Sequence, residues 1–169
     1  MSKNKEKTDD KAPAPDKRLD VEAPALPITI HAQYLKDFSY ESPNSPQIFK
    51  RGGKAPEMDM NFHLDAKKID DEEIPQLYET TIRINITAKR DIGTAFLIEC
   101  VYGALVSLPK DIDVTHIRPM LFVEVPQMLF PFARQVVANA TAVGGFPPLM
   151  LNPIDFRGMY VAHYAETKN

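Results

Sequence analysis

The hydrophobic pattern of the chain changes its period once, and this change constrains the fold more than any other feature. Between Ile28 and about Leu108, apolar residues recur at every second position, which is typical of strands with one buried face. Beyond Asp113 they recur every three or four positions, as on one side of a helix. Strands first and helices last indicate an α+β domain in which helices cover one face of a sheet.

Four antiparallel strands, joined in sequence, are predicted from the alternation. They run from Ile28 to Glu41, through Met58–Leu64, from Leu77 to Lys89, and from about Thr94 to Leu108. In the first strand, Ile28, Ile30 and Ala32 are expected to share one face. Prolines at 43 and 46 end this strand because they favour turns and remove ladder donors.

The second half of the chain is expected to form a long helix that prolines interrupt, followed by a shorter helix. The helical stretches are 114–124, 127–143 and 155–165. Asp113 suits the N-cap of the first stretch. Pro119, Pro126 and Pro131 each remove a backbone hydrogen bond and can kink the rod. Gly144, the first of two consecutive glycines, is a strong stop signal.

The predicted fold is therefore α+β: a four-stranded antiparallel sheet with a kinked long helix and a shorter C-terminal helix on one face. Residues 27–169 form this domain. Residues 1–26 hold balanced charges, several prolines and few large apolar side chains, so we expect a disordered charged tail. The helix at 127–143 is apolar on more than one side, since Met128, Phe130 and Val143 lie off its main stripe. Self-association is therefore expected.

Composition narrows the classes of partner and compartment. The formal net charge of -3 argues against nucleic acid as the main partner. The single cysteine, Cys100, excludes an intrachain disulfide framework and fits a reducing cytosol. No apolar run approaches the roughly 18 residues of a membrane span, and the opening MSKNKEKTDD lacks the apolar core of a signal peptide. We expect a cytoplasmic protein without stable membrane insertion.

Catalytic chemistry finds no support in the residue pattern. Asp59, Asn61, His63 and Asp65 share a strand face, but consecutive members lie about 7 Å apart, which favours a solvated face over a metal site. The histidines lack metal-ligand spacing, and one cysteine cannot form a thiolate zinc cluster. No nucleophile elbow or phosphate-binding glycine loop is present. We therefore assign no catalytic residue, metal or cofactor. A small oligomeric enzyme with a site between subunits remains the alternative from another class.

Two kinds of binding surface are better supported. Asp37 and Glu41 share one strand face, and Leu97 and Glu99 share another. If both strands expose the same side of the sheet, these side chains form an acidic patch, whereas the simpler interpretation is an ordinary wet face. An apolar groove is the second candidate, although core packing would explain the same residues. Its members are Met58, Met60, Phe62, Phe132, Phe146, Leu149 and Tyr160.

The residues themselves resemble a known family. Five pieces occur in the family's order, namely YLKDFSYESPNSP at 34–46, TAFLIE at 94–99, LFPFAR at 129–134, GFP at 145–147 and PIDF at 153–156. Together they resemble SecB, the bacterial protein-export chaperone, over about residues 28–165. The resemblance implies an α+β protomer, pairs of which build an eight-stranded sheet, and a homotetramer formed as a dimer of dimers. It further implies binding of unfolded precursor proteins and delivery to the SecA motor, without ATP or a catalytic group.

The resemblance also assigns roles to the two candidate surfaces. The family's SecA-contacting positions correspond to Asp37, Glu41, Leu97 and Glu99. Its client groove corresponds to Met58, Met60, Phe62, Phe132 and Tyr160. The chain departs from the family in having no tryptophan near 51–57. A SecB-like chaperone dedicated to one partner, such as an antitoxin, is the alternative within the family, and the acidic positions that are present speak against it.

Overall fold

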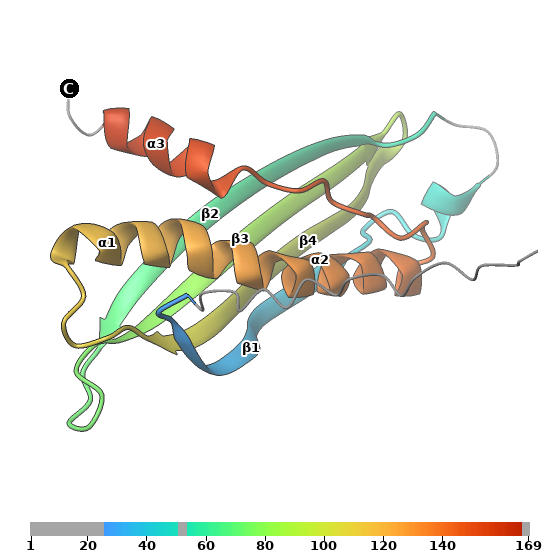
Figure 1. Ribbon diagram of the computed structural model, residues 1–169. Helices are drawn as coiled ribbons and strands as arrows, with labels where there is room; N and C mark the ends of the chain where they lie inside the picture. Colours follow the sequence, from blue (N-terminus) through green and yellow to red (C-terminus); the bar gives the residue numbers. More distant parts are fainter. Residues whose placement is uncertain (1–25, 51–53, 167–169) are drawn as a thin grey trace, which may run out of the picture.

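The computed structural model describes residues 26–50 and 54–166, which form one sheet with helices on one of its faces (Figure 1). The strands are β1 (Thr29–Glu41), β2 (Glu57–Ile69), β3 (Leu77–Arg90) and β4 (Gly93–Ser107), and the helices are α1 (Val114–Pro119), α2 (Val125–Val143) and α3 (Phe156–Glu166). The predicted α+β class is confirmed. Of the predicted tail, residues 1–25 lie outside the described residues, so its disorder stays a prediction.

Within the described residues the sheet has four strands in the order β1-β4-β3-β2, and every neighbouring pair is antiparallel. The strands β2, β3 and β4 follow one another as hairpins, as the sequence predicted. The first strand departs from a simple meander because it crosses to pair with β4 instead of β2. Consequently β1 and β2 form the two edges, and the central strands β3 and β4 carry most of the core.

The core lies between the central strands and α2. Ile84 of β3 and Ile98 of β4 are 0% and 1% exposed, and both point to the helix side of the sheet. From α2, Leu129, Ala133 and Val137 face them and are fully buried. Each large aliphatic side chain buried in this way contributes about 1.5–3 kcal/mol to the free energy of unfolding. The alternation in the strands and the i, i+4 spacing in the helix therefore meet at one apolar layer.

Two irregularities in β1 decide which of its side chains face the helices. The pairing with β4 shifts between Ile30 and Ala32, and again between Leu35 and Asp37, so each shift adds one residue to β1. An added residue moves the following side chains to the other face. Ala32, predicted to share a face with Ile30, is therefore exposed on the opposite side, and that prediction was wrong. The second shift returns the following even-numbered side chains to the helix side, so Phe38 packs against the core.

The predicted broken helix is present as a rod with one irregular segment. Asp113 caps α1 by accepting the backbone N–H of Thr115 at 2.8 Å, as predicted. A π-helical turn, Met120–Glu124, follows Pro119 and leads directly into α2. The regular part begins at Val125, two residues before the predicted start, and contains Pro126 in its first turn. Pro131 is accommodated inside α2.

The two ends of the segment after α2 are fixed by their caps. At Gly144 the backbone N–H donates to the Ala140 carbonyl at 2.8 Å, and a Cβ there would overlap the Tyr40 hydroxyl. Glycine is therefore required by the close approach of β1, in addition to its role as a stop signal. At the other end, the Asp155 carboxylate accepts the N–H of Gly158 at 2.9 Å, which fixes the start of α3 one residue after the predicted start.

Truncating a core isoleucine should destabilise the fold far more than truncating an exposed one. Ile84→Ala removes buried volume between β3 and α2 and should lower the free energy of unfolding by about 2–5 kcal/mol. Ile92→Ala makes the same chemical change at a 58% exposed position in the β3–β4 turn and should cost under about 0.5 kcal/mol. Urea denaturation at one fixed protein concentration measures both. Equal losses would contradict the assignment of the core.

Candidate binding surfaces

An apolar strip runs along the helix side of the edge strand β2. Met58, Met60, Phe62 and Leu64 pair with the inward-facing Ala88, Ile86, Ile84 and Ile82 of β3, so all four point to that side. We call these four residues the β2 strip. It extends for about 20 Å, at about 3.3 Å per residue. Within the described residues β2 is the last strand of the sheet, so the strip is covered incompletely, and Met60 is 43% exposed.

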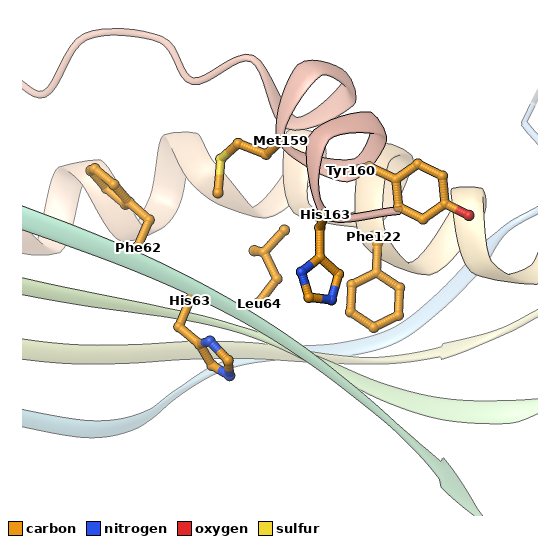
Figure 2. A pocket seen from close by; sticks show the side chains of 7 residues that line it. All are labelled: Phe62, His63, Leu64, Phe122, Met159, Tyr160 and His163. Atoms are coloured by element: carbon orange, nitrogen blue, oxygen red, sulfur yellow. The ribbon is translucent and has the colours of Figure 1, made fainter. Parts of the chain in front are cut away.

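A pocket of about 210 Å³ opens at one end of the strip, between β2 and α3 (Figure 2). Its lining residues are Phe62, His63, Leu64, Phe122, Met159, Tyr160 and His163. Figure 2 shows Leu64, Phe122 and His163 close together below α3, whereas His63 points to the other side of the strand. The lining is mainly apolar and aromatic, and His63, Tyr160 and His163 add polar atoms to it. Such a pocket suits an apolar side chain of a partner.

An aromatic cluster lies level with the other end of the strip. The ring of Phe146 is 5.0 Å from that of Phe49 and 5.0 Å from that of Phe96. Ala88 of β3 pairs with Met58 on one side and with Phe96 on the other, so these three residues form one row across the sheet. Phe49 is 46% exposed and presents aromatic surface to solvent. The cluster therefore lies level with Met58, two strands away on β4.

Five of the seven predicted groove residues fall into the strip, the pocket or the aromatic cluster, and two lie elsewhere. Met58, Met60 and Phe62 belong to the β2 strip, Tyr160 lies in the pocket and Phe146 in the aromatic cluster. Leu149 lies in the loop after α2, which is tied down where its backbone N–H donates to the buried Thr141 hydroxyl at 2.8 Å.

Phe132 lies apart from the strip, the pocket and the aromatic cluster. It lies on α2, stacks on Tyr102 of β4 with ring centroids 6.2 Å apart, and is 50% exposed. Met159 and Phe122, in contrast, line the pocket without having been assigned to the groove. The spacing of Met159 along α3 could have indicated it, whereas no signal in the sequence places Phe122 beside β2.

The four acidic-patch candidates lie together on the sheet face opposite the helices. In the β1–β4 register Glu41 is directly across from Leu97, and Glu99 is across from Ser39, one side-chain position from Asp37 on the same face. Directly opposed side chains have Cβ atoms about 4.5–5.5 Å apart, and diagonal neighbours about 7–8 Å. Asp37, Glu41 and Glu99 are exposed and Leu97 is partly buried. We call these four residues the acidic face.

Cys100 lies on the helix side of β4, directly next to a residue of the acidic face in the sequence. Its side chain is fully buried on the helix side, one residue along β4 from Glu99. Burial and, to a lesser degree, the Asp37 carboxylate raise the pKa of this thiol to about 11. It is therefore a packing residue and has no nucleophilic character at neutral pH.

The other polar residues that the structure describes assemble no site for a metal ion. Across residues 26–50 and 54–166, no cluster of three histidine, cysteine or carboxylate side chains is placed to bind one. Asp59, Asn61, His63 and Asp65 do share the face opposite the helices, as their alternation predicted. None of the helices in this part of the chain is long and apolar enough to span a bilayer.

The fold and both surfaces define a class of protein that binds other polypeptides. An apolar strip at an open sheet edge lies on one face, and a group of carboxylates lies on the other. A family model described as SecB, preprotein translocase subunit SecB, matches residues 21–167. The chain belongs to the SecB family.

Relatives of similar length share about two fifths of the sequence. The chain is 41% identical to a protein-export protein SecB of Bartonella quintana, covering 82% of this chain and 85% of the relative. It is 40% identical to a protein of the same name from Rhodospirillum centenum, covering 80% and 79%. The fold is similar to a SecB-like chaperone of Mycobacterium tuberculosis, solved with a peptide from an antitoxin, with a TM-score of 0.61. That match is 16% identical and covers 75% of this chain and 90% of the other.

The Cys100 thiol should react with a disulfide reagent only when the sheet opens. With a pKa of about 11, only on the order of one thiol in a thousand is ionised at pH 8, and burial blocks access. We expect reaction with Ellman's reagent at pH 8 to be at least about 100-fold slower in the native protein than in urea. Absorbance at 412 nm measures it. A native rate within a few-fold of the denatured rate would contradict this placement.

Proposed function

We propose that this protein is a chaperone for protein export that binds unfolded precursor proteins and delivers them to SecA. The observation that carries the proposal is the β2 strip, an apolar row on an open edge strand with the pocket at one end and the aromatic cluster level with the other. Relatives about 40% identical over most of their length bear the name protein-export protein SecB, which supports the same activity. The protein works without a catalytic group, a metal or a nucleotide, and acts in the cytoplasm.

An unfolded precursor segment binds along the strip in an extended conformation. Alternate side chains of such a segment face the strip, at the same spacing as Met58, Met60, Phe62 and Leu64. Their burial contributes about 25 cal/mol per Å² of apolar surface. Backbone groups on the outer edge of β2 add main-chain hydrogen bonds, which carry no side-chain specificity. Methionines adapt to different side chains, so one strip accepts many sequences.

Several strips on one assembly strengthen the retention of a client. The helix side leaves apolar surface beyond the strip: Phe132 is 50% exposed and Val143 is 90% exposed on α2. We propose that such surfaces bring protomers together as a homotetramer, a dimer of dimers. Once one segment of a chain is bound, neighbouring strips meet the rest at a high effective concentration. Weak individual contacts then hold a long unfolded chain.

The acidic face serves as the docking surface for SecA. Asp37, Glu41 and Glu99 attract a basic segment, and Leu97 adds an apolar contact at the edge of the group. Clients and SecA use opposite faces of the sheet, so both are bound at the same time. Attraction between exposed charges should weaken with salt. At 16% identity, the similarity to the SecB-like chaperone solved with an antitoxin peptide concerns the fold alone. It therefore does not favour an antitoxin as the partner of this protein over precursor proteins.

Polar substitutions on the strip should weaken client holding. Met60→Gln with Met159→Gln replaces two exposed apolar side chains, one on the β2 strip and one in the pocket, while leaving the core intact. Each methionine contributes on the order of 1 kcal/mol when a client covers it. The double variant should therefore hold a denatured, slow-folding precursor about 30-fold less tightly. Fluorescence anisotropy of a labelled precursor measures the Kd.

The matched control places the same kind of change off the strip. Ile92→Gln removes a 58% exposed apolar side chain from the β3–β4 turn and should leave the Kd unchanged. If the control weakens holding as much as the double variant, apolar surface in general binds the client and the strip is not the site. Unchanged aggregation of the precursor in the presence of stoichiometric wild-type tetramer would refute the chaperone function itself.

Neutralising the acidic face should impair SecA binding and spare client holding. Asp37→Asn with Glu99→Gln removes two charges from the acidic face. This should weaken SecA binding roughly tenfold or more at low salt, and by a smaller factor at high salt. Asp59→Asn with Asp65→Asn removes two charges from β2 on the same face and serves as the control. Calorimetry with purified SecA measures both variants. Equal losses in SecA binding and client holding would rule out separate surfaces.

A further inference from the structure

Lys36 lies immediately before Asp37 and on the same side of the sheet. In a regular strand, adjacent residues point to opposite faces. The register shift between Leu35 and Asp37 makes Lys36 the added residue, and its ammonium group meets Glu79, whose register places it on the face of Asp37. A cation so close to Asp37 would neutralise part of the acidic face. The contacts of Lys36 therefore decide how much charge that face presents.

Glu79 of β3 holds Lys36 from two strands away. Nζ of Lys36 donates to both carboxylate oxygens of Glu79, at 2.6 and 2.7 Å. The hydroxyl of Tyr34 donates to the same carboxylate at 2.5 Å. The Glu79 side chain is only 17% exposed, whereas that of Lys36 is 46% exposed. Three hydrogen bonds to one partly buried carboxylate make a defined ion pair, in contrast to a loose surface pair.

β4 lies between β1 and β3, and a glycine in it leaves room for the Tyr34 side chain to contact Glu79. Gly103 of β4 lies between Tyr34 on β1 and Thr81 on β3. A Cβ at Gly103 would lie 3.2 Å from the Tyr34 ring and 3.2 Å from the Thr81 methyl group. The missing side chain lets the ring lie across β4, with its hydroxyl at Glu79. The glycine, the tyrosine and the added residue in β1 thus all favour the same ion pair.

We propose that Glu79 is a positioning residue for partner docking: it draws Lys36 away from Asp37 and so keeps the acidic face open to a basic partner. This inference rests on the proposed docking of SecA on that face. Hydrogen bonds from Lys36 and then Tyr34 hold the pKa of Glu79 below its usual value, so the carboxylate is ionised at neutral pH. Without this partner, the Lys36 ammonium is free to turn to Asp37, its neighbour in sequence.

A substitution cycle separates this role from simple loss of charge. Glu79→Gln keeps the shape of the side chain and frees Lys36, and should weaken SecA binding about fivefold at low salt. Lys36→Met in the same chain removes the freed cation and should restore binding to within about twofold of wild type. Asp65→Asn removes one charge from the same face without freeing a lysine and should change binding less than twofold. Calorimetry with purified SecA measures all three.

The restoration is the deciding result. If Glu79→Gln with Lys36→Met binds as weakly as Glu79→Gln alone, Glu79 acts through the structure of the sheet and the proposal is overturned. Wild-type affinity of Glu79→Gln overturns it as well, while leaving SecA docking on the acidic face intact. Failure of the wild-type protein to bind SecA overturns the proposed function, and the docking role with it.

A second measurement on the free protein needs no partner. The ammonium of Lys36 should acylate several-fold faster in Glu79→Gln than in wild type, because its hydrogen bonds to the carboxylate are gone. Peptide mass spectrometry after brief acetylation measures the rate, with Lys89 on β3 as the internal reference. Equal rates at Lys36 would show that Glu79 does not hold it, and would overturn the proposal whatever SecA does.

Discussion

The burial of the central strands beneath α2 is the interaction on which the rest of the structure depends. Ile84 and Ile98 are almost completely excluded from water, and Leu129 and Val137 of α2 complete the same layer. Side chains alternate along a strand, so fixing one set against the helices commits the other set to the opposite face. The wet face and the apolar face are therefore two consequences of one packing event.

This coupling explains how neighbouring residues serve different partners. Glu99 and Cys100 are adjacent in β4, yet one is exposed on the acidic face and the other is fully buried under the helices. Clients and SecA, in the function proposed above, do not compete because a sheet separates them. Client binding also requires that β2 lies at the edge of the sheet, since an apolar strip on a central strand would be fully covered.

The sequence predicted these elements well wherever one period held over many residues. The strand at 77–89, the cap at Asp113 and the stop at Gly144 were all placed within a residue or two. Prediction failed for Ala32, because an added residue in a strand leaves no mark in composition and reverses every later side chain until a second one follows. The four residues of the acidic face were predicted together only on condition that their strands share a face. The pairing of β1 with β4 supplies that condition.

The sequence by itself determined the α+β class, the two alternating faces of each strand and the absence of a recognisable catalytic motif, because periodicity and residue chemistry are local properties. Only the tertiary structure decided which strands are neighbours, which apolar residues lie at an open edge, and that Lys36 reaches Glu79 across β4. It separated Phe132 from the strip and brought Phe122 to the pocket beside β2. These are contacts between residues far apart in the chain, set by which pairing of strands and helices buries the most apolar surface, and no local pattern encodes that choice.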